Sequence, residues 1–203
     1  MKKKSFAFLL VLCMMFSLLP FGAAATGFQD VTADAYYHDP VDWALNHEPQ
    51  ITNGTSPTTF SPDMTCTRAQ AVTFLWRAAG SPEPKINVMP FEDVAAEAYY
   101  YKAVLWAVEN GITKGTSATT FSPDADCTRA QIVTFLWRAQ KSPAADAVNP
   151  FTDVAADDYY VDAVLWAVKE EVTKGTSTTT FSPDADCTRA QIVTFLYRAL
   201  ADK

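Results

Sequence analysis

The chain has 203 residues, of which 49% are hydrophobic and 19% charged, and its formal net charge is −7. This composition is too apolar and too weakly charged for an intrinsically disordered protein. The negative charge argues against non-specific binding to nucleic acid or to an anionic membrane surface.

The first 25 residues have the pattern of an export signal. Three lysines at positions 2–4 precede an apolar run over residues 6–19, and alanines at 23–25 offer a cleavage site. The apolar run is shorter than the roughly 20 residues of a spanning helix. We therefore predict a signal peptide over 1–25 and a secreted protein without membrane contact after cleavage. Cleavage removes three lysines and no acid, which leaves 13 basic and 23 acidic residues and a net charge of −10.

The rest of the chain is one unit written three times. Each unit opens with Phe-x-Asp-Val, at Phe28, Phe91 and Phe151, with starts 63 and 60 residues apart. Residues 91–138 and 151–198 are identical at 37 of 48 positions. Such a period makes the repeat the structural unit. We predict three domains separated by linkers that contain proline or glycine, over residues 26–80, 88–142 and 148–203.

Each repeat predicts two helices joined by a long loop. In the second repeat the first helix covers about 99–110 and is apolar nearly all round, so it should be buried on most sides. The second begins at Thr128, where Thr-Arg-Ala-Gln matches a capping box, and Cys127 and Ile132 occupy the positions of a hydrophobic staple. One repeat cannot bury both helices alone. We predict an all-α fold of three helix–loop–helix repeats around a pseudo-threefold axis, with the first helices at the centre.

Each repeat also carries one cysteine, at Cys66, Cys127 and Cys187. Around a pseudo-threefold axis these side chains should be mutually distant. We expect buried free thiols rather than disulfides.

The order of motifs closely resembles the S-layer homology (SLH) domain. These motifs are Phe-x-Asp-Val, an aromatic pair, Ala-Val-x-Trp-Ala, Gly-x-x-x-Gly, Phe-x-Pro-Asp and Thr-Arg-Ala-Gln, and the match runs from Phe28 to about residue 200. The resemblance implies a three-pronged pseudo-trimer whose inter-repeat grooves hold a secondary cell-wall polysaccharide, often pyruvylated. It also implies a location in the cell wall or S-layer of a Gram-positive-type bacterium.

The repeats depart from the family pattern in ways that predict unequal grooves. Ala118-Thr119-Thr120 and its counterparts replace the Asp-Gly-Thr that is common in the family, and glutamine replaces the motif glutamate. The first repeat carries a two-residue insertion after its first helix, and Glu171 stands where the second repeat has Gly111.

The arginine of each Thr-Arg-Ala-Gln motif is the leading candidate for contact with an anionic polysaccharide. Each arginine lies in the first turn of a helix, where free N–H groups and the helix dipole favour an anion. The guanidinium adds a planar fork that matches a carboxylate. Helical periodicity places Arg129 on the apolar side, facing a cleft, and Arg138 on the opposite side with Gln131 and Thr134. A structural alternative is a salt bridge between repeats, to Asp93 or Asp124. The candidates are Arg68, Arg129 and Arg189.

Other residues are weaker candidates for the same site. Trp43, Trp106 and Trp166 favour core packing over sugar stacking, and one tyrosine of each aromatic pair should pack while the other meets solvent or ligand. The Phe-x-Asp-Val aspartates favour turn capping over contact with a sugar hydroxyl. The remaining candidates are Trp76, Trp137 and Tyr197 as groove walls, Asp30, Asp93 and Asp153, and Gln70, Gln131 and Gln191.

Three classes of function follow. The favoured class is a non-catalytic module that binds anionic wall polysaccharide, with no cofactor and no metal, since no acidic stretch has the spacing of a calcium loop. The alternative is a structural component of a surface lattice, with other surface-layer proteins as partners. An enzyme is disfavoured, because neither His38 nor His47 recurs and no nucleophile motif is present.

Overall fold

The computed structural model describes residues 26–201, so the signal peptide predicted for residues 1–25 lies outside the described part. The described residues form helices and loops, with β-structure limited to isolated bridges, which confirms the predicted all-α class. The helices are α1 (His38–Asn46), α2 (Arg68–Ala78), α3 (Tyr101–Glu109), α4 (Arg129–Ala139), α5 (Val161–Lys169) and α6 (Arg189–Leu200).

The second helix of every repeat begins at its predicted capping box. In α4 the Thr128 hydroxyl accepts the Gln131 backbone N–H at 3.3 Å, and the Gln131 side chain accepts the Thr128 N–H at 3.4 Å. The same pair of bonds starts α2 and α6. Local sequence alone therefore fixes where these helices start.

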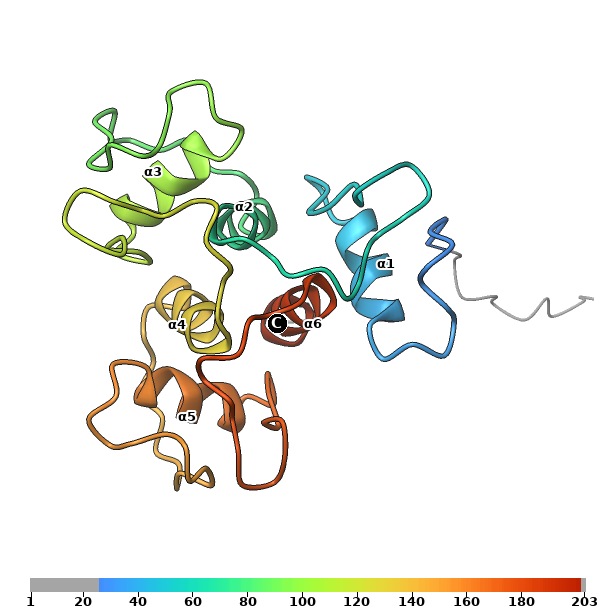
Figure 1. Cartoon of the computed structure of the whole chain (residues 1–203), viewed down its shortest axis with the longest axis vertical. Helices are drawn as coiled ribbons and strands as arrows, with labels where there is room; N and C mark the ends of the chain where they lie inside the picture. Colours follow the sequence, from blue (N-terminus) through green and yellow to red (C-terminus); the bar gives the residue numbers. More distant parts are fainter. Residues whose placement is uncertain (1–25, 202–203) are drawn as a thin grey trace, which may run out of the picture.

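The second helices, and not the first, lie at the centre of the molecule (Figure 1). Helices α2, α4 and α6 contact one another, whereas α1, α3 and α5 lie outside them in three prongs. The prediction that the apolar first helices are central was therefore wrong. A central helix must bury one side against two other central helices and another against a prong, and Ile132, Val133 and Leu136 of α4 are all fully buried. Ala103, Val104 and Ala107 of the first helix α3 belong to the same hydrophobic cluster as Phe121 of the following loop.

Each prong is shared between two repeats. Helix α3 packs on α2, α5 on α4, and α1 on α6, so that every first helix packs on the second helix of another repeat. The pairing of α1 with α6 joins the first repeat to the last and closes the arrangement into a ring.

The three cysteines lie at the point where the repeats meet, which corrects the prediction that they are mutually distant. The Cys127 N–H donates to the Cys66 carbonyl at 2.8 Å, the Cys187 N–H to the Cys127 carbonyl at 2.8 Å, and the Cys66 N–H to the Cys187 carbonyl at 3.0 Å. The predicted burial and free state of the thiols are confirmed. Burial raises the pKa of Cys66 and of Cys187 to about 12, and raises that of Cys127 well above its usual value.

Candidate functional site: grooves between the repeats

Two grooves of equivalent construction open between the repeats. Groove A has a volume of about 400 Å³ and groove B about 440 Å³. Ten side chains or backbone segments line each one, with the same ten residue types and no acidic residue among them. Groove A consists of Arg68, Thr113, Lys114, Gly115, Thr116, Gln131, Thr134, Phe135, Arg138 and Tyr159. Groove B consists of Tyr36, Arg129, Thr173, Lys174, Gly175, Thr176, Gln191, Thr194, Phe195 and Arg198.

Each groove takes residues from all three repeats. In groove A, Arg68 comes from the first repeat, the loop at 113–116 and helix α4 from the second, and Tyr159 from the third. Of the predicted site residues, the fold therefore brings Arg68 together with Gln131, and Arg129 with Gln191. No groove is complete within one repeat.

The motif arginines are buried against the neighbouring repeat. The Arg129 Nε–H donates to the Phe181 carbonyl at 2.9 Å, and its guanidinium carbon lies 5.0 Å from the centroid of the Phe181 ring. Arg68 makes the equivalent contacts with Phe121. Within residues 26–201 neither arginine forms an ion pair, so the salt bridge to an aspartate that we considered is not formed. Each arginine instead contacts the neighbouring repeat through a backbone carbonyl and the face of an aromatic ring.

The positive charges of Arg68 and Arg129 are not balanced by an ion pair within the described residues. Burial lowers the pKa of Arg68 and of Arg129 from the usual value, although arginine keeps its charge at neutral pH. Arg129 is 4% exposed, and its Nη2 is buried without a hydrogen-bond partner among the described residues. Because a buried unsatisfied donor is costly, an anion in groove B that accepts from this nitrogen would remove the cost.

The helix N-termini are not free to bind an anion, which corrects the expectation that their N–H groups contribute to the arginine site. The first two backbone N–H groups of α4, at Arg129 and Ala130, donate to the Ala185 and Pro183 carbonyls at 3.0 Å each. The third donates to the Thr128 cap. Helices α2 and α6 are closed in the same way by the loop of a neighbouring repeat. The side-chain cations therefore remain as the donors for a ligand.

Two further cations in each groove were missed as candidates. Arg138 lies with Gln131 and Thr134, as helical periodicity predicts, but that side faces groove A rather than open solvent, and Arg138 Nη1 donates to the Ile112 carbonyl at 3.1 Å. Lys114 is exposed on the loop. The only signal in the sequence was the recurrence of Thr-Lys-Gly-Thr in the second and third repeats.

In two of the three aromatic pairs one tyrosine stands at a groove. Tyr159 in groove A is 62% exposed, whereas Tyr160 is 9% exposed and meets its neighbour edge-on at 4.9 Å between ring centroids. Tyr36 occupies the same place in groove B. This confirms that one tyrosine packs while the other is open to solvent.

The predicted tryptophan walls do not line grooves A and B. Trp76 and Trp137 donate their indole N–H groups to the Pro82 and Pro143 carbonyls of the linkers, both at 2.9 Å. Tyr197 packs edge-on against Trp43. Among the first-helix tryptophans, Trp106 and Trp166 are buried and Trp43 packs against the core, in agreement with a role in packing.

The Phe-x-Asp-Val aspartates clamp the loop of their own repeat. The two carboxylate oxygens of Asp153 accept the Phe181 and Ser182 N–H groups at 2.8 and 2.7 Å. Burial raises the pKa of Asp153, but these donors outweigh it and leave the pKa below its usual value. Asp93 holds Phe121 and Ser122 in the same way, and Asp30 holds Phe60 and Ser61.

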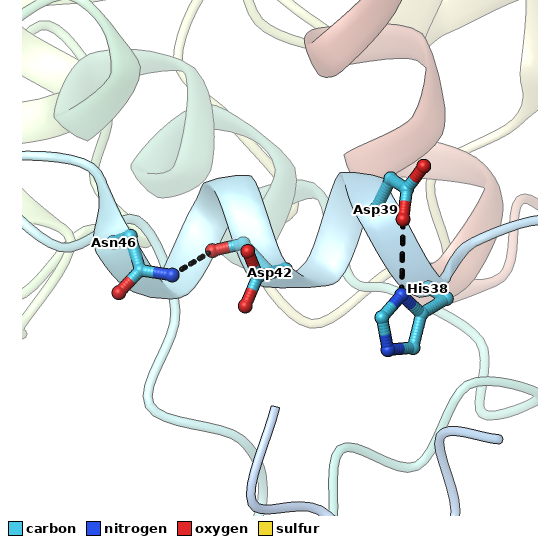
Figure 2. Close-up of polar contacts among 4 residues, drawn as sticks. All are labelled: His38, Asp39, Asp42 and Asn46. Carbon is cyan, nitrogen blue, oxygen red and sulfur yellow. Dashed lines mark hydrogen bonds and ion pairs between the residues drawn. The ribbon is translucent and has the colours of Figure 1, made fainter. Parts of the chain in front are cut away.

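Two polar pairs lie along α1, His38 with Asp39 at its start and Asp42 with Asn46 towards its end (Figure 2). His38 Nδ1 lies 3.0 Å from Asp39 Oδ1, and the Asn46 side chain donates to the Asp42 carbonyl at 2.9 Å. None of these residues lines groove A or B. The part of the chain that the structure describes contains no cluster of three metal-ligating side chains, and none of its helices is long and apolar enough to cross a membrane.

Comparison with known proteins agrees with this geometry. The model of the S-layer homology domain matches the chain three times, over residues 27–72, 90–133 and 150–193. The chain belongs to the S-layer homology domain family. Each SLH match includes the opening Phe-x-Asp-Val and the Thr-Arg-Ala-Gln that carries the groove arginine.

Several relatives are surface proteins. The chain is 31% identical over 155 residues to the surface-layer 125 kDa protein of Lysinibacillus sphaericus, which covers 74% of this chain and 13% of that protein. It is 33% identical over 144 residues to a cell surface protein of Thermoanaerobacter kivui, covering 68% of this chain and 18% of that protein. An endoglucanase of a Bacillus strain is 30% identical over 122 residues, 60% of this chain and 13% of the enzyme. The chain thus spans less than a fifth of the length of these relatives.

Proposed function

We propose that the chain is a non-catalytic cell-surface module that attaches to an anionic, pyruvylated secondary polysaccharide of a Gram-positive-type cell wall. The observation that carries this proposal is the composition of the two grooves. Each gathers two arginines, one lysine and an exposed tyrosine, with no acidic residue, on a protein of net negative charge. Membership in the SLH family and the surface location named for several relatives support it.

The chemistry of the groove suits a carboxylate on a sugar. The Arg129 guanidinium, whose Nη2 has no hydrogen-bond partner among the described residues, supplies one positive charge for the carboxylate, and Lys174 supplies a second at the rim. The exposed face of Tyr36 packs against the apolar face of the sugar ring. A pyruvate ketal offers a carboxylate next to such a face, whereas a neutral polymer lacks the group that the cations recognise.

Recognition must be local rather than long-range. The net charge of the chain is negative, so a polyanion is repelled at distances beyond the groove. Two grooves on one chain compensate by avidity if one polymer reaches both. We therefore expect weak binding of single sugars and much stronger binding of the polymer.

The test is retention of residues 26–203 by purified wall polysaccharide before and after mild acid has removed its pyruvate ketals. We expect retention by the native polymer and loss of retention after treatment. Equal retention by both polymers would contradict recognition of the carboxylate. Binding to intact walls that disappears when other surface proteins are stripped would instead favour a lattice component.

A matched pair of variants tests the grooves. The double variant Lys114→Ala/Lys174→Ala removes one cation from each groove, and Lys102→Ala/Lys169→Ala removes two exposed lysines elsewhere. Both change the net charge equally. We expect about a fivefold loss of affinity per groove for the first variant, from an exposed charge pair of about 1 kcal/mol, and no loss for the second. Equal effects of the two would mean that the grooves are not where the polymer binds.

A further inference from the structure

The third junction between the repeats, where the last repeat meets the first, carries the same ten positions as grooves A and B. We define these positions as the third site. Nine of the ten residues are identical in type to those of both grooves, including Arg189, Arg77 and Tyr99. The one difference is Asn53, which stands where the grooves have Lys114 and Lys174.

The third site folds like the other two. The Arg189 Nε–H donates to the Phe60 carbonyl at 2.9 Å, and Arg77 Nη1 donates to the Ile51 carbonyl at 3.0 Å. These distances match those of the equivalent bonds in groove A. The backbone and both arginines are therefore in place, and only the lysine is missing.

Arg189, the motif arginine of the third site, also makes a hydrogen bond that the arginines of grooves A and B do not make among the described residues. Its Nη2 donates to the Thr52 hydroxyl at 3.4 Å, whereas Arg68 and Arg129 make no such bond to Thr113 or Thr173 within the described residues. A ligand at the third site must compete with this internal acceptor, although at 3.4 Å the bond is long. In groove B the equivalent nitrogen of Arg129 has no hydrogen-bond partner within residues 26–201.

We propose that the chain has two strong sites and one weak site for an anionic sugar, and that the residue after the buried loop threonine sets the difference. Lys114 and Lys174 are the affinity-determining residues of grooves A and B, and Asn53 makes the third site weak. This inference rests on the proposed function, because it ranks the same kind of site. It gives the chain a valence of two for single sugars, although the fold repeats three times.

The glycine that follows this residue offers a separate reporter for each site. The N–H groups of Gly54, Gly115 and Gly175 each donate to the loop threonine of their own site, at 3.2, 3.1 and 3.1 Å. The three amides thus make the same local hydrogen bond, and their separate NMR signals report on the three sites individually. Titration of residues 26–203 with the methyl glycoside of a single pyruvylated sugar, too small to span two sites, then reads each dissociation constant separately.

We expect the Gly115 and Gly175 amides to respond at about fivefold lower sugar concentration than Gly54, the size of one exposed charge interaction. The variant Asn53→Lys should bring Gly54 into line with the other two, whereas Asn53→Gln, which changes length without charge, should not. Asn53 is exposed, so both variants should fold, which thermal unfolding verifies.

Two results would overturn the ranking. One is equal dissociation constants at all three glycines in the unmodified chain, and the other is an Asn53→Lys variant whose Gly54 response is unchanged. Absence of any response at all three amides is a different result, since it would contradict the proposed function itself. The methyl glycoside without pyruvate serves as the control and should shift none of the three amides.

Discussion

The sequences of the three repeats agree at the centre of the molecule and differ at the tips of its prongs. At the centre the three repeats share the motif Cys-Thr-Arg-Ala-Gln, which starts at Cys66, Cys127 and Cys187. At the prong tips the chain after each first helix differs: His47 begins an insertion in the first repeat, Gly111 follows α3 and Glu171 follows α5. A central residue contacts other repeats through its backbone and its side chain, so a change there alters more than one interface. A tip residue faces solvent and can vary alone.

The largest effect is expected at the centre, from the buried thiols. A thiol whose pKa is raised on folding stabilises the folded state at low pH and loses that contribution as the pH rises from its usual value of 9.0 towards about 12. Over that window the unfolded chain releases up to three more protons than the folded chain. The free energy of unfolding should fall by up to about 4 kcal/mol per pH unit, measured by urea unfolding.

The triple variant Cys66→Ala/Cys127→Ala/Cys187→Ala provides the control for this slope. It should be less stable at pH 7, because each truncated side chain leaves a small cavity, but its stability should fall much less steeply above pH 9. The same slope in both proteins would show that other groups, such as the tyrosines, cause it.

A smaller effect on stability is expected where Asp153 holds the loop of its own repeat. Asp153→Ala leaves the Phe181 and Ser182 N–H groups without their acceptor and should destabilise the chain by about 2–3 kcal/mol in urea unfolding. Asp157→Ala, which removes an exposed carboxylate four residues further along the chain, should change stability by less than about 0.5 kcal/mol. Losses of equal size would mean that charge, and not the clamp on the loop, stabilises the prong.

The smallest effect, and one of opposite sign, is expected at a prong tip. Glu171 has φ +57°, a left-handed conformation that costs a residue with a side chain about 1 kcal/mol relative to glycine. Glu171→Gly should therefore stabilise the chain by about 1 kcal/mol, seen as a higher midpoint of thermal unfolding. The reverse change, Gly111→Glu, tests the same backbone, because a Cβ there meets nothing within 4 Å. Its failure to destabilise would contradict the assigned strain.

Prediction from sequence succeeded where the determinants are local. The capping boxes at Thr67, Thr128 and Thr188 use residues three positions apart, and the start of each second helix was correct. Prediction failed where two repeats decide together. The apolar first helix indicated a central position, but the helix that must contact two others takes the centre.

The candidate site shows the same limit. Arg68 could be singled out from its motif, but its partner Phe121 lies 53 residues away and its N-terminal N–H groups are satisfied by that same neighbouring loop. Lys114 belongs to a Thr-Lys-Gly-Thr sequence that recurs around Lys174, but only its position in the same groove as Arg68 marks it as a candidate. A groove assembled from three repeats cannot be predicted from the sequence of a single repeat.

The ring of hydrogen bonds among the three cysteine backbones joins the three repeats into a closed circle. Each repeat donates to one neighbour and accepts from the other, and the bond from Cys66 to Cys187 uses the last free donor and acceptor. A fourth copy inserted into the chain would find no place in this circle, and a chain with two copies would leave it open. The three repeats therefore form a closed set in which each one contacts both of the others.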